Sequence, residues 1–194
     1  MFSRHLDELP LKIRNWTAGL HTGIARLSRL NAPIVAAVHG TAMGGAVALV
    51  AGCDLVYAAR GASFGAAYSS IGYSLDAGAS YTLASRMGLA RARRYVLCGE
   101  MLTAEEAAVA GLVDFVVDDD AVFAEAEAAA LRLAQGPTRA FGEVRRLFRK
   151  SLSQPFEAQL EDEAQALSLI SGSTDAREGI MAFVEKRKPV FVGK

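Results

Sequence analysis

The apolar positions between residues 32 and 59 predict a buried strand, a short buried helix and a second buried strand. Residues 34–38 form an apolar run of strand length with β-branched side chains, and residues 55–59 form a second apolar strand. Residues 46–51, which lie between them, are apolar on every side, as expected of a fully buried helix. Two apolar strands around a short buried helix indicate stacked β-α units.

The remaining pattern is mostly helical, with one long irregular segment. Residues 9–30 carry apolar side chains at near-helical spacing, and residues 103–106 have the T-x-x-E pattern of a capping box. Residues 66–78 are rich in Gly, Ser and Tyr without a clean period, and a loop this long inside a compact domain tends to be functional. Further predicted elements are a strand over residues 112–117 and helices over residues 79–86, 90–98, 104–110, 121–133, 138–152, 156–170 and 175–186.

Two glycines, Gly44 and Gly45, precede the helix predicted over residues 46–51. Free N–H groups at a helix N-terminus, beside glycines that admit close approach, suit an oxygen that carries partial negative charge. A glycine pair in this place is also a common packing device. The chain contains neither G-x-x-x-x-G-K-[ST] nor G-x-G-x-x-G, so phosphate and dinucleotide loops are not indicated.

Charge and composition narrow the class of protein. The 194 residues include 21 Lys+Arg and 21 Asp+Glu, so the formal net charge is zero. This balance does not favour nucleic acid or a membrane surface as a partner. The apolar runs are too short to span a membrane, and the first residues lack a signal-peptide core. Cys53 and Cys98 have apolar neighbours, so we expect buried, reduced thiols in a cytoplasmic protein. The spacing of His5, His21 and His39 predicts no metal site.

Four blocks of the chain, in order, are similar to a known family. Together they resemble the crotonase superfamily, that is, the enoyl-CoA hydratase/isomerase family, over nearly the whole chain. The resemblance implies an α/β fold with a crotonase-like ββα spiral core and a C-terminal helical trimerisation region. It also implies acyl-CoA substrates, a homotrimer or hexamer, and no cofactor beyond the coenzyme A of the substrate. The blocks are IVAAVHGTAMGGAVALVAGCDLVYAA, SFGAAYSSIGYSLDAGASYTLASRMG, LTAEEAAVAGLVDFVV and TDAREGIMAFVEKRKPVF.

Under this resemblance, residues 1–118 form an N-terminally shortened spiral core and residues 119–194 form the helical region. Family members usually carry a further segment before the matched blocks, which supplies the first spiral turns and a second oxyanion-binding N–H group. We therefore expect either that the start codon was assigned too far downstream or that the chain is a fragment.

The family's chemistry assigns roles to several positions. Removal of a proton next to the thioester turns its carbonyl into an enolate-like oxyanion, which two backbone N–H groups hold, each worth about 3 kcal/mol in a dry site. The match assigns one of these N–H groups to Gly45, with Gly44 beside it. The two catalytic glutamates of the hydratases fall at Ala48 and Tyr68. Neither residue can act as a carboxylate base, which argues against addition of water by that route, and both positions are candidates for substrate binding.

Asp76, in the string SLDAG, matches the place where some isomerases and a dehalogenase of the superfamily carry a functional aspartate. It is therefore the candidate base, although aspartate is also a common turn residue and helix cap. Tyr68 has three interpretations: a wall of the pocket, a hydroxyl donor to the substrate, or a core residue.

Phe183 and Lys186 match positions that lie near coenzyme A in this family, and Lys186 could meet a phosphate. A solvated lysine at a helix C-terminus is the alternative. Together these features predict an acyl-CoA enzyme that shifts a double bond in an enoyl-CoA thioester. The alternatives are a hydratase with another acid-base set and a catalytically inactive acyl-CoA-binding subunit.

Overall fold

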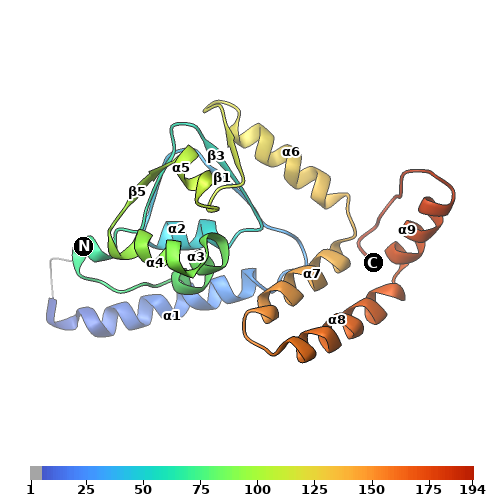
Figure 1. Ribbon diagram of the computed structural model, residues 1–194, viewed down its shortest axis with the longest axis horizontal. Coiled ribbons are helices and arrows are strands. Elements are labelled where there is room, and N and C mark those ends of the chain that lie inside the picture. The colour runs from blue at the N-terminus through green and yellow to red at the C-terminus, as the bar shows by residue number, and fades with distance from the viewer. Residues whose placement is uncertain (1–5) are drawn as a thin grey trace. The chain divides into compact units, whose positions relative to one another are not determined.

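The computed structural model describes residues 6–194 and divides into two compact units (Figure 1). One unit contains the chain up to Ser28 together with Val35–Ala126, and the other contains Arg29–Ile34 and Glu127–Lys194. The first unit holds the β-strands and the second is helical, which agrees with the predicted change from β-α to all-helical structure. A functional division into residues 1–118 and 119–194 stays a prediction.

A parallel sheet of order β1-β3-β6 is the centre of the first unit. Its middle strand is the most buried, with Val56 and Ala58 fully enclosed, because neighbours pair with it on both sides. Val35 pairs with Leu55, and the ring of Tyr57 stacks on its neighbour Phe115 with centroids 4.6 Å apart. The strands are β1 (Val35–Val38), β3 (Leu55–Ala59) and β6 (Phe115–Val117).

A second small sheet, β2-β4-β5, was not predicted from the sequence. Strand β4 pairs in parallel with β2 and antiparallel with β5, and the Phe64 side chain is fully buried. Gly65 is opposite Met43 and Met101, whose sulfur atoms occupy the space that a side chain at Gly65 would need. The strands are β2 (Thr41–Met43), β4 (Ser63–Gly65) and β5 (Met101–Thr103).

Three helices pack in series in the first unit, with α2 against α3 and α3 against α4. The Thr82 hydroxyl on α3 donates to the Ala48 carbonyl on α2, at 3.2 Å, and so joins the first two of these helices. Gly88, with φ +75°, ends one helix and begins the next. The helices are α2 (Gly45–Ala51), α3 (Ala79–Met87) and α4 (Leu89–Leu97).

The other elements of the first unit follow the predicted pattern closely. Thr103 and Glu106 form the expected capping box, in which the Thr103 hydroxyl accepts from the Glu106 N–H and the Glu106 carboxylate accepts from the Thr103 N–H. Helix α6 begins in this unit and crosses its boundary. The elements are a 3-10 turn (Leu6–Glu8), α1 (Leu9–Leu27), a 3-10 turn (Ser69–Ile71), α5 (Ala104–Val109) and α6 (Val122–Ala134).

An ion pair joins the end of α3 to the parallel sheet. Arg86 donates to both carboxylate oxygens of Asp114, at 2.8 and 2.9 Å, and to the Cys53 carbonyl at 2.6 Å. The same carboxylate accepts from the Val56 N–H at 2.7 Å. The expectation of two buried thiols is wrong for Cys98, which is exposed because it ends α4 on the outer surface, while Cys53 is partly buried.

The second unit consists mainly of α7, α8 and α9, of which α7 packs on α8 and α8 on α9. Asp162 of α8 pairs with Arg146 and Lys150 of α7. Several large apolar side chains stay exposed in this unit, among them Phe148 and Phe156. The helices are α7 (Thr138–Ser151), α8 (Phe156–Ser171) and α9 (Thr174–Val184).

Two carboxylates of α9 fix the C-terminal segment of the chain. Asp175, which is almost fully buried, accepts from the N–H groups of Val192 and Gly193 at 2.7 and 2.8 Å. Glu178 pairs with both terminal nitrogens of Arg187, at 2.6 and 2.9 Å. The Arg187 guanidinium, with help from a backbone N–H, lowers the pKa of Glu178 to about 2.

This shift predicts a pH-dependent contribution of Glu178 to stability. Because the folded-state pKa lies below the ordinary value of 4.5, the ionised carboxylate stabilises the fold above pH 4.5 and this contribution is lost as the pH falls toward 2. We expect Glu178→Gln to lower the melting temperature near neutral pH, with the difference from the parent chain shrinking across that window. Glu157→Gln, an exposed carboxylate on α8, is the control. A difference that stays constant from pH 7 to 2 would contradict the assignment.

Candidate active site

The turn between β2 and α2 depends on a conformation that only glycine adopts readily. Gly44 has φ 55° and ψ −121°, and its N–H donates to the Gly65 carbonyl at 2.9 Å. Gly45 is then the first residue of α2, so its N–H has no acceptor within the helix. The turn thus presents a backbone N–H group at the start of a helix, as the sequence predicted. The expected full burial of that helix is wrong, because one face packs inward while Leu49 on the other is 40% exposed.

The segment that follows β4 approaches this turn. It begins at Ala66 and ends at Gly78, and it contains one short 3-10 turn as its regular structure. Ala67 and Ala77, close to its two ends, have φ values of 59° and 51°. Alanine rarely adopts this left-handed region, so contacts with the surroundings must hold both residues there. The predicted functional loop is therefore a fixed and locally strained segment.

This segment places the Asp76 carboxylate beside Gly45. A Cβ atom built on Gly45 would lie 3.5 Å from Asp76 Oδ1 and 3.9 Å from Oδ2. The Asp76 side chain caps no helix, because the residue at the N-cap of α3 is Gly78. Only its backbone carbonyl takes part in the turn, where it accepts from the Ala79 N–H at 2.9 Å. The Asp76 carboxylate therefore lies beside Gly45 and is not used as a helix cap.

Tyr68 contacts Asp76 directly. The tyrosine is buried, and its hydroxyl donates to Asp76 Oδ1 at 2.7 Å. Burial, together with the hydrogen bond to Asp76, raises the pKa of Tyr68 well above its ordinary value, so the phenol keeps its proton at neutral pH. Sequence reasoning had considered Tyr68 as a wall, a substrate donor or a core residue and had missed this bond.

His21 is a second residue of the site that sequence reasoning missed. It projects from α1, and its Nε2 accepts from the Ala77 N–H at 3.1 Å. An accepting Nε2 requires a neutral imidazole with its proton on Nδ1. The two residues are 56 positions apart, and no local motif connects them, so the sequence held no signal for this contact.

The other predicted site residues lie in two places. Ala48 is buried on α2, one turn after Gly45, and presents no polar side chain. Phe183 and Lys186 lie in the second unit at the end of α9, where Phe183 is 85% exposed and Lys186 has φ 55°. The structure thus brings together Gly44, Gly45, Ala48, Tyr68 and Asp76 within one unit.

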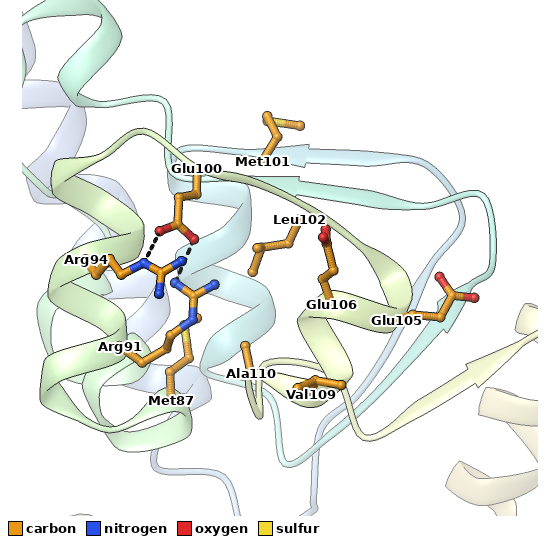
Figure 2. A pocket seen from close by; sticks show the side chains of 10 residues that line it. All are labelled: Met87, Arg91, Arg94, Glu100, Met101, Leu102, Glu105, Glu106, Val109 and Ala110. Carbon is orange, nitrogen blue, oxygen red and sulfur yellow. Dashed lines mark hydrogen bonds and ion pairs between the residues drawn. The ribbon is translucent and has the colours of Figure 1, made fainter.

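A cavity of about 750 Å³ elsewhere in the first unit contains many charged groups (Figure 2). In it, Arg91 and Arg94 point toward Glu100 and pair with its two oxygens, each at 2.7 Å. Burial works to raise the pKa of Glu100, but these two pairs outweigh it and lower the value. Arg91 and Arg94 therefore already pair with Glu100. We interpret this group of side chains as a structural ion-pair network and not as a binding site. Its lining residues are Met87, Arg91, Arg94, Glu100, Met101, Leu102, Glu105, Glu106, Val109 and Ala110.

The structure describes residues 6–194, and two findings on metal sites and membrane spans hold for this range. Within that range no three side chains of His, Cys, Asp or Glu are grouped so as to hold a metal ion. No helix in the same range combines the length and apolar character needed to cross a bilayer. His5, part of the histidine prediction, lies outside the described residues.

Comparisons with known proteins identify the family of the chain. The enoyl-CoA hydratase/isomerase family model matches residues 14–194. A Rhodobacter capsulatus protein named "Probable enoyl-CoA hydratase" is 41% identical over 162 residues, which are 84% of this chain and 63% of that protein. The 1,2-epoxyphenylacetyl-CoA isomerase of Escherichia coli is 37% identical over 171 residues, which are 88% of this chain and 65% of that protein.

Solved structures show the same likeness. An enoyl-CoA hydratase/isomerase from Cupriavidus metallidurans superposes with a TM-score of 0.91 at 30% identity, covering 99% of this chain and 72% of that one. The fold is therefore the predicted α/β, crotonase-like class. The chain belongs to the enoyl-CoA hydratase/isomerase family. It spans slightly less than two thirds of the length of the two curated relatives described above.

Alanine substitution is expected to destabilise the protein at Gly44 much more than at Gly45. Gly44→Ala forces a left-handed conformation on alanine and should lower the free energy of unfolding by about 1–3 kcal/mol. Gly45→Ala places its methyl group at ordinary contact distance from Asp76 and should change stability by less than about 1 kcal/mol. Urea unfolding of both variants measures the difference. Equal losses in the two variants would contradict the assigned roles of the turn.

Proposed function

We propose that this chain processes acyl-CoA thioesters and shifts a double bond in an enoyl-CoA substrate. The observation that supports this proposal is the juxtaposition of the Asp76 carboxylate and the turn at Gly45. An enolate intermediate needs a base next to a group that stabilises an oxyanion. Membership of the family and the name of the Escherichia coli isomerase support the substrate class.

In the proposed reaction, Asp76 acts as the base and the Gly45 N–H binds the thioester oxygen. The carboxylate takes a proton from C2 of a 3-enoyl-CoA, and the electron pair of the broken C–H bond delocalises onto the thioester oxygen and the allylic carbons. The same carboxylic acid then returns its proton at C4. The double bond moves to C2–C3 without any other reactant. One carboxylate is sufficient for both steps because it is regenerated by the second.

Hydration is the alternative reaction, since the Rhodobacter relative is named as a hydratase. The hydratase glutamates, by the family match, correspond to Ala48 and Tyr68. Ala48 has no acid-base group, and the raised pKa of Tyr68 keeps its hydroxyl protonated. The carboxylate of Asp76 lies beside Gly45 and supports the alternative in which one acid-base group serves the reaction. A single carboxylate supports proton transfer between two carbons better than the two-glutamate addition of water.

We propose that the second unit serves coenzyme A binding and assembly. Lys186 directly follows the last turn of α9, where its N–H donates to the Phe183 carbonyl at 3.2 Å and its positive charge is available for a phosphate. Phe183 offers an exposed ring to an adenine. Exposed apolar side chains such as Phe148 and Phe156 suit contacts between copies of the chain, so we infer a homotrimer or hexamer.

The isomerase proposal predicts that Asp76→Asn loses activity while it keeps its fold. Asparagine has the same shape and still accepts from Tyr68, but it cannot take a proton. We expect isomerisation of 3-enoyl-CoA thioesters to fall by about 10²–10⁴-fold, as for loss of a general base. Turnover is followed by the ultraviolet absorbance of the conjugated product, and deuterium uptake at C2 in D₂O reports the first step separately.

Asp120→Asn is the matched control, because Asp120 is exposed and remote in sequence from the glycine turn. It should retain the parent rate. Undiminished isomerisation by Asp76→Asn would remove Asp76 as the base. Hydration of 2-enoyl-CoA without isomerisation, or binding of either thioester without turnover, would overturn the isomerase proposal in favour of the two alternatives.

Gly45→Ala tests the other half of the proposed site. Its methyl group would lie 3.5 Å from Asp76 Oδ1, next to the place where the thioester is proposed to bind. A displacement of the substrate by about 1 Å is expected to lower kcat/KM by about 100-fold. Parent-like kcat/KM in this variant, together with an unchanged melting temperature, would argue against the placement of the thioester.

A further inference from the structure

Two side chains from separate parts of the first unit hold the segment that carries Asp76. Tyr68 donates to Asp76 Oδ1 at 2.7 Å, and His21 accepts from the N–H of the next residue, Ala77, at 3.1 Å. We propose that Tyr68 and His21 are positioning residues that fix the Asp76 carboxylate beside the Gly45 turn. This inference rests on the proposed function, in which Asp76 is the base.

Tyr68 fixes the direction of the carboxylate. Its own backbone is restrained, because its N–H donates to the Ala66 carbonyl at 2.8 Å and its carbonyl accepts from the Tyr73 N–H at 3.0 Å. The buried ring therefore presents the hydroxyl from a constant position. A free aspartate side chain samples several rotamers. A short hydrogen bond from a fixed donor to Oδ1 selects one of them.

His21 fixes the backbone next to the carboxylate. Ala77 and Gly78 both have positive φ, 51° and 81°, so the chain reverses sharply between Asp76 and α3. This conformation is unfavourable for alanine and needs support from outside the segment. The imidazole of His21 supplies it by accepting the Ala77 N–H, which is otherwise a buried donor. This hydrogen bond thereby connects helix α1 to the residue that follows Asp76.

The two contacts act on the same residue from different directions. Reacting groups must be held to within about 0.5 Å for efficient proton transfer, and an irregular loop does not give that precision by itself. Tyr68 restrains the end of the Asp76 side chain and His21 restrains its backbone. Loss of either contact should leave substrate binding intact and slow the chemical step.

The test compares Tyr68→Phe, His21→Leu and His21→Gln in the 3-enoyl-CoA assay on the full chain. Misplacement of the base predicts that kcat falls by about 10–100-fold in Tyr68→Phe and about 10-fold in His21→Leu, with KM within about twofold of the parent. His21→Gln should recover most of the loss, because its amide oxygen can accept the Ala77 N–H. Tyr73→Phe is the matched control: the same loop loses a hydroxyl that does not contact Asp76.

A double-substitution test separates positioning through Asp76 from a general structural effect. In an Asp76→Asn background, Tyr68→Phe and His21→Leu should have no further effect on the residual rate. Equal additional losses in that background, or parent-like kcat in both single variants, would overturn the positioning proposal. Melting temperatures check that each variant is folded. Full activity of Asp76→Asn would instead overturn the proposed function, so the two failures are distinguishable.

Discussion

The hydrogen bond from the Gly44 N–H to the Gly65 carbonyl, 2.9 Å long, is the contact on which the proposed site depends. Gly44 sets the direction of α2 and hence the position of the Gly45 N–H. Gly65 is the last residue of β4, directly before the segment that carries Tyr68 and Asp76. This one backbone contact therefore fixes the Gly45 N–H relative to the start of the segment that carries Asp76. It forms only because Gly44 adopts a conformation that other residues avoid.

Sequence reasoning located the elements whose own side chains determine them. The strand over residues 55–59 is buried from Val56 onward, so its apolar run identifies it directly. The helix over residues 46–51 was also located by its apolar run, although only one face of it is buried and Leu49 is 40% exposed. The capping box at Thr103 is local and was equally clear. Strands β2, β4 and β5 were missed, because three residues carry no periodic pattern and become a strand through pairing with distant partners.

The same distinction applies to the site. Gly45 and Asp76 could be named from the sequence through a family resemblance, and the structure places them side by side. The contacts that hold Asp76 could not be named. Tyr68 reaches it through an irregular loop, and His21 approaches from a helix 56 residues earlier than Ala77. No spacing rule covers either case, because both depend on how the first unit packs.

The positive φ values in the loop show how local preference and function are balanced. Ala67 directly precedes Tyr68, and Ala77 directly follows Asp76, so the two strained alanines enclose the hydrogen-bonded pair. Each left-handed alanine costs about 1–2 kcal/mol relative to ordinary backbone. A sequence optimised for stability alone would place glycine there. Alanine leaves the segment fewer alternative conformations than glycine would, since the φ of glycine is free on both sides of zero. The two strained alanines thus restrict the positions that the Asp76 carboxylate can take. The base proposed at Asp76 needs this restriction, because it must stay beside the Gly45 N–H.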